Sequence, residues 1–106
     1  MPVLFYITTL KPGVDPDEYE AWLLKHDRPF AESHSNFKSY NVHRIFGPIE
    51  GAESSGWRYV ERLELESLEQ HTRDLASPEG KAIIDEIEAR FVDASKTICF
   101  ASHIIA

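Results

Sequence analysis

The order in which strand patterns and helix patterns alternate along the chain constrains its fold more than any other feature. Apolar, β-branched and aromatic runs predict strands at 3–10, 37–46, 57–65 and 97–105. Helix signals follow the first and third of these runs. The predicted order is strand–helix–strand–strand–helix–strand, which is typical of an α+β ferredoxin-like sandwich, a four-stranded antiparallel sheet with helices on one face. The 106 residues suit one such domain, spanning 1–106.

Both helical regions begin with a capping residue followed by proline. Asp15 precedes Pro16 and Ser77 precedes Pro78, so each pair supplies a side-chain acceptor and a preset helical φ angle. Ser67 predicts a further cap, for a short helix that ends before Ser77. The second helical region is therefore expected to be split in two.

The first helix carries an apolar stripe. Tyr19, Trp22, Leu23 and His26 follow the i, i+3, i+4, i+7 spacing of one helix face. We therefore expect His26 to point at the sheet. Pro29 is expected to end or kink the helix, with either a short continuation or an irregular loop after it.

The first and last strands are apolar on both faces. In the first strand, Val3 and Phe5 alternate with Leu4 and Tyr6, and the last strand repeats this pattern. An antiparallel sheet covered on one face only should show a polar side. Since no segment remains to form a second layer, we expect a homodimer in which sheet packs on sheet. Gly- and Ser-rich residues 47–56 are expected to form an exposed hairpin loop.

The charge balance argues against several classes of partner. Eighteen acidic residues against eleven basic ones give a net charge of −7, which disfavours nucleic acid and anionic membrane surfaces. No run of 18 apolar residues and no signal-peptide pattern is present. Cys99 is the single cysteine and cannot form an internal disulfide. These features predict a cytoplasmic protein that binds no nucleic acid and no membrane.

Three residues are candidates for catalysis. His26 on an apolar helix face could transfer protons near neutral pH, or it could hold a backbone carbonyl at the helix end. His43, expected on the same strand face as Phe37 and Ile45, could be a second acid or base, or a residue of the dimer interface. Tyr6 could orient a substrate through its hydroxyl, or it could be a core aromatic residue with its hydroxyl at the rim.

Four further residues are candidates for binding. Trp22, Trp57 and Tyr59 could line a pocket by stacking. Glu61 interrupts the apolar face of its strand, so it must find a partner or shift its pKa upward. It could orient a histidine in the pocket or bind an arginine across the dimer. No His, Cys or carboxylate spacing typical of a metal site occurs, so we expect neither a metal nor a cofactor.

The chain resembles the dimeric α+β barrel superfamily in three segments. They are the opening strand and turn at 2–13, the helix-borne Trp22, His26 and Pro29, and the Ser67-Leu68-Glu69 segment followed by 75–79. Within the superfamily the chain is similar to the RedY-like family, which includes HapK. The resemblance covers nearly the whole chain.

The resemblance implies a homodimer in which each subunit keeps a pocket between its helices and its sheet. The RedY-like family is associated with pathways to pyrrole or indole natural products, which implies antibiotic-type secondary metabolism and a small aromatic ligand. Superfamily members include cofactor-free monooxygenases, isomerases, and cyclising or dehydrating enzymes, so the fold alone does not select a reaction. Haem-degrading enzymes also occur in it, which leaves haem ligation by His26 or His71 as an alternative.

The leading interpretation is a cofactor-independent enzyme that acts on an aromatic or heteroaromatic intermediate by general acid–base chemistry. His26 would transfer the proton, and Tyr6 and His43 would orient the substrate. Two alternatives remain. One is a non-catalytic carrier that shelters such an intermediate, and the other is a structural dimer whose own side chains fill the pocket.

Overall fold

The computed structural model describes residues 1–46 and 58–106, so the expected loop at 47–56 and Trp57 lie outside the described residues. Four strands form one antiparallel sheet in the order β2-β3-β1-β4. The strands are β1 (Val3–Thr8), β2 (Phe37–Arg44), β3 (Tyr59–Leu65) and β4 (Ile98–Ser102). This is the ferredoxin-like α+β fold, and the prediction from the order of elements is confirmed.

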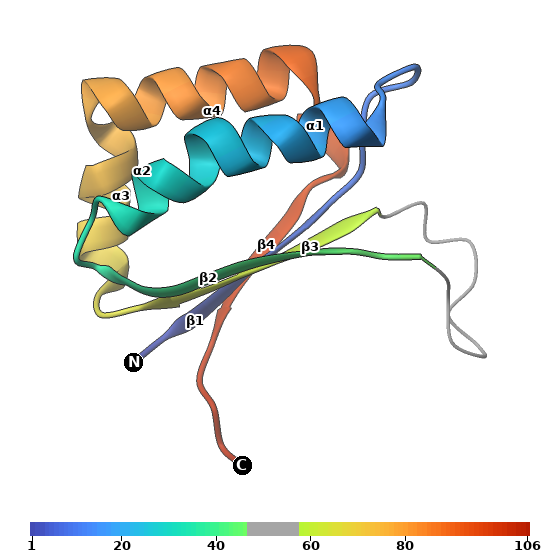
Figure 1. Cartoon of the computed structure of the whole chain (residues 1–106). Coiled ribbons are helices and arrows are strands. Elements are labelled where there is room, and N and C mark those ends of the chain that lie inside the picture. Colours follow the sequence, from blue (N-terminus) through green and yellow to red (C-terminus); the bar gives the residue numbers. More distant parts are fainter. Residues whose placement is uncertain (47–57) are drawn as a thin grey trace.

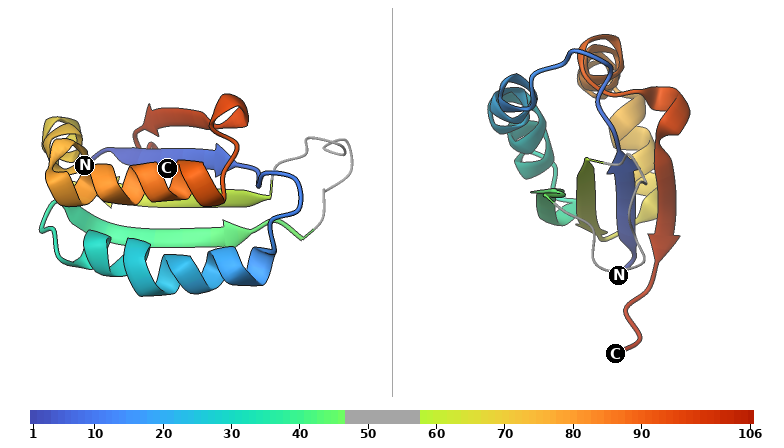
Figure 2. Two further views of the ribbon diagram at one scale, coloured as in Figure 1. Left: turned by 90° about the horizontal axis from the view of Figure 1, so that it is seen from above. Right: turned by 90° about the vertical axis from the view of Figure 1, so that its right-hand side faces the viewer.

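The helices cover one face of the sheet (Figures 1 and 2). They are α1 (Pro16–Trp22), the π-helical η1 (Leu23–Asp27), α2 (Arg28–Glu32), α3 (Leu68–Ala76), α4 (Pro78–Arg90) and the 3-10 turn η2 (Ala94–Lys96). The α1–η1–α2 run and α4 lie above the sheet, and α3 lies at one end of it (Figure 1). None of the helices in the described part of the chain is long and apolar enough to cross a membrane.

The predicted helix caps are present. The carboxylate of Asp15 accepts a hydrogen bond of 2.9 Å from a backbone N–H in the first turn of α1. The hydroxyls of Ser67 and Ser77 accept corresponding bonds of 3.2 and 3.0 Å at the starts of α3 and α4. Each cap satisfies one of the donors that the first helical turn leaves unpaired. The second helical region is split, as the sequence predicts.

The first helical run continues through Pro29. Proline has no N–H to donate to the carbonyl four residues back, and its ring crowds that carbonyl in a regular α-helix. The chain widens into the π turn η1 just before Pro29, where the N–H of Arg28 bonds to the carbonyl of Leu23, five residues back. Pro29 then lies in the first turn of α2. Of the two expected outcomes after Pro29, the short helical continuation is the one found.

The uncovered face of the sheet is apolar along β1 and β4. Tyr6 of β1 points toward the helices, whereas Phe5 points away and stacks on Phe100 of β4, with ring centroids 5.4 Å apart. Phe100 and its strand neighbour Ile98 are 45% and 41% exposed. The two-sided apolar pattern of the first and last strands therefore corresponds to a face that no helix covers.

A register shift in β2 changes which side chains share a face. The pairing with β3 shifts between Phe37 and Ser39, as at a β-bulge. Phe37 therefore lies on the same side as Tyr40, and both line the pocket described below. The expectation that Phe37 and His43 share a strand face is wrong, because one extra residue exchanges the two faces.

Candidate functional site

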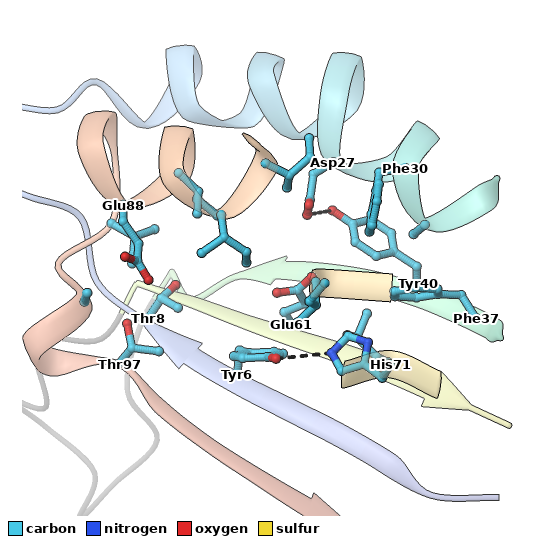
Figure 3. A pocket seen from close by; sticks show the side chains of 18 of the residues that line it. Tyr6, Thr8, Asp27, Phe30, Phe37, Tyr40, Glu61, His71, Glu88 and Thr97 are labelled. Carbon is cyan, nitrogen blue, oxygen red and sulfur yellow. Dashed lines mark hydrogen bonds between the residues drawn. The ribbon is translucent and has the colours of Figure 1, made fainter. Parts of the chain in front are cut away.

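A cavity of about 290 Å³ lies between the sheet and the helices (Figure 3). Ligand sites commonly have volumes of about 300–1,000 Å³, so this cavity suits a compact molecule. Its walls are mostly apolar, and they include Phe30, Ala31, Phe37, Leu63, Ile84 and Ile87. The polar side chains Tyr6, Asp27, Tyr40, Glu61 and His71 gather in one part of the cavity (Figure 3).

Asp27 reaches the cavity because of the π turn. The wider turn places Asp27 where a regular α-helix would place His26. The carboxylate accepts a hydrogen bond of 2.6 Å from the hydroxyl of Tyr40. Burial raises the pKa of Asp27 above its ordinary value, and the Tyr40 hydrogen bond opposes part of that rise.

Glu61 enters the same cavity from β3, below Asp27 in the view of Figure 3. Burial raises the pKa of Glu61 well above its usual range, and the charge of Asp27 raises it further. The two carboxyl groups are coupled, because the charge left on one disfavours ionisation of the other. We refer to Asp27 and Glu61 as the carboxyl pair. The pair holds a proton at pH values where isolated carboxyl groups have lost theirs.

A second polar contact lies beside the carboxyl pair. The Tyr6 hydroxyl and Nε2 of His71 are hydrogen-bonded at 3.3 Å, with the donor set by the histidine tautomer. Burial lowers the pKa of His71, although the charge of Asp74 opposes this, and burial raises the pKa of Tyr6. Both groups are therefore neutral near neutral pH. His71 is only 6% exposed, and its Nδ1 has no hydrogen-bond partner among the described residues.

The structure brings two of the seven predicted site residues into the cavity. Tyr6 and Glu61 line it. The expectation that His26 points at the sheet is wrong: His26 is exposed, with its ring 5.8 Å from that of Trp22. His43 is also exposed, on the face of the sheet that carries no helices. Trp57 lies outside the described residues.

The other two predicted pocket residues belong to the protein core. Trp22 and Tyr59 are 4% and 2% exposed and pack in one cluster with Tyr19 and Phe91; Tyr19 lines the cavity, whereas Trp22 and Tyr59 do not. The hydroxyl of Tyr59 donates to Glu20 of α1 at 2.8 Å, where Arg44 of β2 also binds Glu20. Their aromatic surface is used to join helix to sheet, so it is not available for stacking on a ligand in this cavity.

Three polar residues that belong to the carboxyl pair or lie beside it were not predicted to line the pocket, although His71 was considered as an alternative haem ligand. His71 had a usable signal, because His71 and Leu75 are spaced i, i+4 on α3 and both line the cavity. Tyr40 had a weaker one, as it alternates with Val42 on the inner face of β2. The sequence contains no signal for Asp27 other than the nearby Pro29, which indicates an irregular helix, because a search for apolar periodicity assumes a regular α-helix.

The arrangement can take up and release a proton in an apolar enclosure. A carboxyl group whose pKa is raised toward neutrality serves as a general acid or a general base. Among residues 1–46 and 58–106, no three His, Cys, Asp or Glu side chains lie together in a way that could hold a metal ion. The neutral phenol and imidazole next to the pair can hydrogen-bond to a ligand without adding charge.

The sequence profile of the REDY-like protein HapK family matches residues 2–103, nearly the whole chain. The chain belongs to this family. The resemblance drawn from the opening strand and from the Trp22, His26 and Pro29 segment is therefore confirmed. No functionally curated protein matches the chain.

Several solved structures have a fold similar to that of this chain, at low sequence identity to it. HapK from Hahella chejuensis is 14% identical in sequence, with a TM-score of 0.77. The match covers 100% of this HapK-family chain and 95% of the Hahella chejuensis chain. At3g17210 from Arabidopsis thaliana is 14% identical in sequence, with a TM-score of 0.79. The match covers 100% of this chain and 97% of the Arabidopsis thaliana chain. SnoaB from Streptomyces nogalater, described as a cofactor-independent oxygenase, is 13% identical in sequence, with a TM-score of 0.74. The match covers 99% of this chain and 93% of the SnoaB chain. At these identities the likeness establishes the ferredoxin-like fold.

Proposed function

We propose that this HapK-family protein is a cofactor-independent enzyme that moves protons on a small aromatic or heteroaromatic biosynthetic intermediate, of pyrrole or indole type. The observation that carries the proposal is the carboxyl pair, in which Asp27 from a helix and Glu61 from a strand meet in an apolar cavity. Both pKa values are raised, chiefly by burial. SnoaB has the same fold and is described as cofactor-independent, which supports chemistry by side chains alone.

In this proposal the carboxyl pair replaces His26 as the proton-transfer group. One carboxyl group holds the shared proton and acts as the acid, while the other acts as the base. Tyr40 positions Asp27 through its hydrogen bond. Tyr6 keeps the orienting role expected from the sequence, now together with His71. The apolar walls take over the ring-binding role that was expected of Trp22 and Tyr59.

The proposal can be tested without knowing the natural substrate. Indole exchanges its C3 hydrogen by protonation followed by loss of the original proton, and NMR follows this exchange in D₂O. We expect the protein to accelerate the exchange over buffer and the Asp27→Asn and Glu61→Gln variants to lose the acceleration. Positioned acid–base groups supply about 10²–10⁴-fold. If indole binds without any acceleration of the exchange, the protein is a carrier. If neither indole nor simple phenols bind, the pocket has only a structural role.

We propose further that two copies pair through the uncovered face of the sheet. The support is the exposed apolar surface of β4 around Phe100 and Ile98, next to Phe5 of β1. Contiguous apolar surface of this kind marks interaction sites in soluble proteins. His43 lies on this same face, so its proposed role is now at the interface between copies.

A further inference from the structure

The ionisable groups around the cavity carry charge of one sign only. Of the described residues that line it, three have carboxyl groups: Asp27, Glu61 and, from α4, Glu88. No lysine or arginine is among those described lining residues. The one histidine, His71, stays neutral because burial lowers its pKa. The cavity therefore offers no positive charge to a ligand.

The groups that face the carboxyl pair from the surrounding elements are also uncharged or acidic. They are Tyr6 of β1, Tyr19 of α1, Tyr40 of β2, His71 of α3, Glu88 of α4 and Cys99 of β4. Burial raises the pKa of each of the three tyrosines, so their hydroxyls remain protonated near neutral pH. Burial also raises the pKa of the Cys99 thiol. The carboxyl pair is thus the main source of variable charge inside the cavity.

We propose that the cavity selects ring compounds that carry a protonated amino group outside the ring, held between Asp27 and Glu61, and that it excludes carboxylates and phosphates. This inference rests on the proposed function and narrows its substrate class. A protonated nitrogen gains charge-assisted hydrogen bonds from carboxylates that are already fixed in place. An anion would be buried beside two carboxyl groups with no cation to compensate it.

His71 provides a separate indication that the cavity receives a polar ligand. The residue is 6% exposed and lies in the cavity wall, yet its Nδ1 has no partner among the described residues. Buried polar atoms are nearly always paired, and an exception needs a physical reason. Nδ1 is closed off in this structure, so a bound molecule with a nitrogen or oxygen group near α3 would supply the missing partner once the His71 ring turns toward the cavity.

The proposed selection depends on pH in a defined direction. A bound cation favours the ionised carboxyl pair, so binding releases the proton that the pair holds in the empty cavity. For a cationic ligand, one of the two carboxylates then takes a proton from the ligand and returns it. Affinity for a cation should therefore rise with pH until the pair has lost this proton. A neutral compound of the same shape leaves the pair protonated, so its affinity should not rise.

Three compounds that share one ring and differ in charge test the inference. Benzylamine is a cation, benzyl alcohol is neutral and benzoate is an anion, and NMR titration of the full chain measures the affinity of each. We expect benzylamine to bind about tenfold or more tightly than benzyl alcohol at about pH 8, with a smaller ratio at about pH 6. We expect no binding of benzoate at either pH.

Matched amide variants assign the preference to the carboxyl pair. Glu61→Gln keeps the size of the side chain and removes its charge, so the preference for benzylamine should fall to about threefold or less. Glu32→Gln is the control, because Glu32 is 70% exposed and pairs with Arg28 on the outside of α2. It should keep the full preference. Thermal unfolding of both variants verifies that each is folded.

The outcomes separate this inference from the proposed function. If the wild-type protein binds benzyl alcohol as tightly as benzylamine, the charge selection is wrong, whereas ring binding and proton transfer stand. Binding of benzoate above benzylamine overturns the selection in the same way. If charge selection is present but indole exchange is not accelerated, the site binds cations without catalysing proton transfer. If no ring compound binds, both proposals fail.

Discussion

Tyr40 donates a hydrogen bond of 2.6 Å to Oδ2 of Asp27, which links a strand side chain to a carboxylate supplied by a π turn. The bond fixes one member of the carboxyl pair from the side of the sheet. It also lowers the pKa of Asp27 against the larger effect of burial. The contact therefore sets both the position and the acidity of the group that we propose to transfer protons.

Removal of this hydrogen bond should make Asp27 a weaker acid. In Tyr40→Phe the pKa of Asp27 should rise, since only burial and the charge of Glu61 remain to act on it. Loss of a hydrogen bond to a buried carboxyl group should lower the free energy of unfolding by about 1–3 kcal/mol. Carbon-13 NMR titration of the aspartate carboxyl groups measures the first effect, and urea unfolding measures the second.

Tyr59→Phe is the matched control for that variant. Its hydroxyl binds Glu20 and makes no contact with Asp27, so its loss should leave the titration of Asp27 unchanged. Equal shifts in the two variants would mean that the effect is not specific to the Asp27–Tyr40 bond.

Glu61 should make the protein less stable as pH rises. Its pKa in the folded protein lies above the ordinary value near 4.5, so the folded state binds more protons than the unfolded state between these two pKa values. The contribution of Glu61 to the free energy of unfolding should therefore fall as pH rises above about 4.5. Glu61→Gln lacks this loss, so the stability of the variant relative to wild type should increase with pH.

Urea unfolding of wild type and Glu61→Gln at several pH values measures this difference. The effect of His71, whose lowered pKa destabilises the folded state as pH falls below about 6.5, is present in both proteins and cancels. Parallel stability curves for the two proteins would contradict the upward shift of the Glu61 pKa.

The two neighbours Asp27 and His26 should differ sharply in their effect on proton transfer. Asp27→Asn should slow indole hydrogen exchange by about 10²–10⁴-fold, the contribution of a positioned acid or base. His26→Asn should leave the rate nearly unchanged, because His26 is exposed and does not line the cavity. Loss of exchange in His26→Asn alone would return the proton-transfer role to the histidine.

The uncovered face of the sheet should determine the oligomeric state. Phe100→Glu places a charge on the apolar surface of β4, and it should convert a dimer into monomers, as measured by light scattering after gel filtration. Leu24→Glu is the control, because Leu24 is also an exposed apolar residue (56%) but belongs to the helical layer. A monomeric wild-type protein would rule out the proposed dimer.

Gly80 should not tolerate a larger side chain. A Cβ atom at this position would lie 2.7 Å from Cα of Leu75 and would also collide with the backbone carbonyl of Asp74. Backbone atoms cannot move aside cheaply, so Gly80→Ala should destabilise the protein by about 1–3 kcal/mol through forced separation of α3 and α4. An unchanged midpoint of thermal unfolding would show that the two helices can shift without loss.

The fold could be predicted from the sequence because its signals are local and agree with one another. The caps at Asp15, Ser67 and Ser77 each mark a helix start, and the two-sided apolar pattern of the first and last strands corresponds to a sheet with one uncovered face. Such signals depend only on neighbouring residues, and consistent local signals specify a fold.

The site could be predicted only where regular periodicity holds. Glu61 lies on a strand without a bulge, and strand alternation places it correctly among inward-facing residues. His26 was misplaced because of the π turn in the helix, and Phe37, which was expected to share a strand face with His43, was misplaced because of the register shift that follows it. Each irregularity is stabilised by tertiary contacts such as the Tyr40–Asp27 hydrogen bond, so no local sequence pattern predicts it.

The π turn also has a consequence for comparisons between related proteins. Insertion of one residue into an α-helix rotates everything after it by about 100° unless the helix absorbs the extra residue in a wider turn. The turn at Leu23–Asp27 has this wider form and holds one residue more than a regular α-helical turn. A relative with a regular α-helix here should therefore be aligned with a one-residue gap, because an ungapped alignment would equate its inward-facing side chain with His26 instead of Asp27.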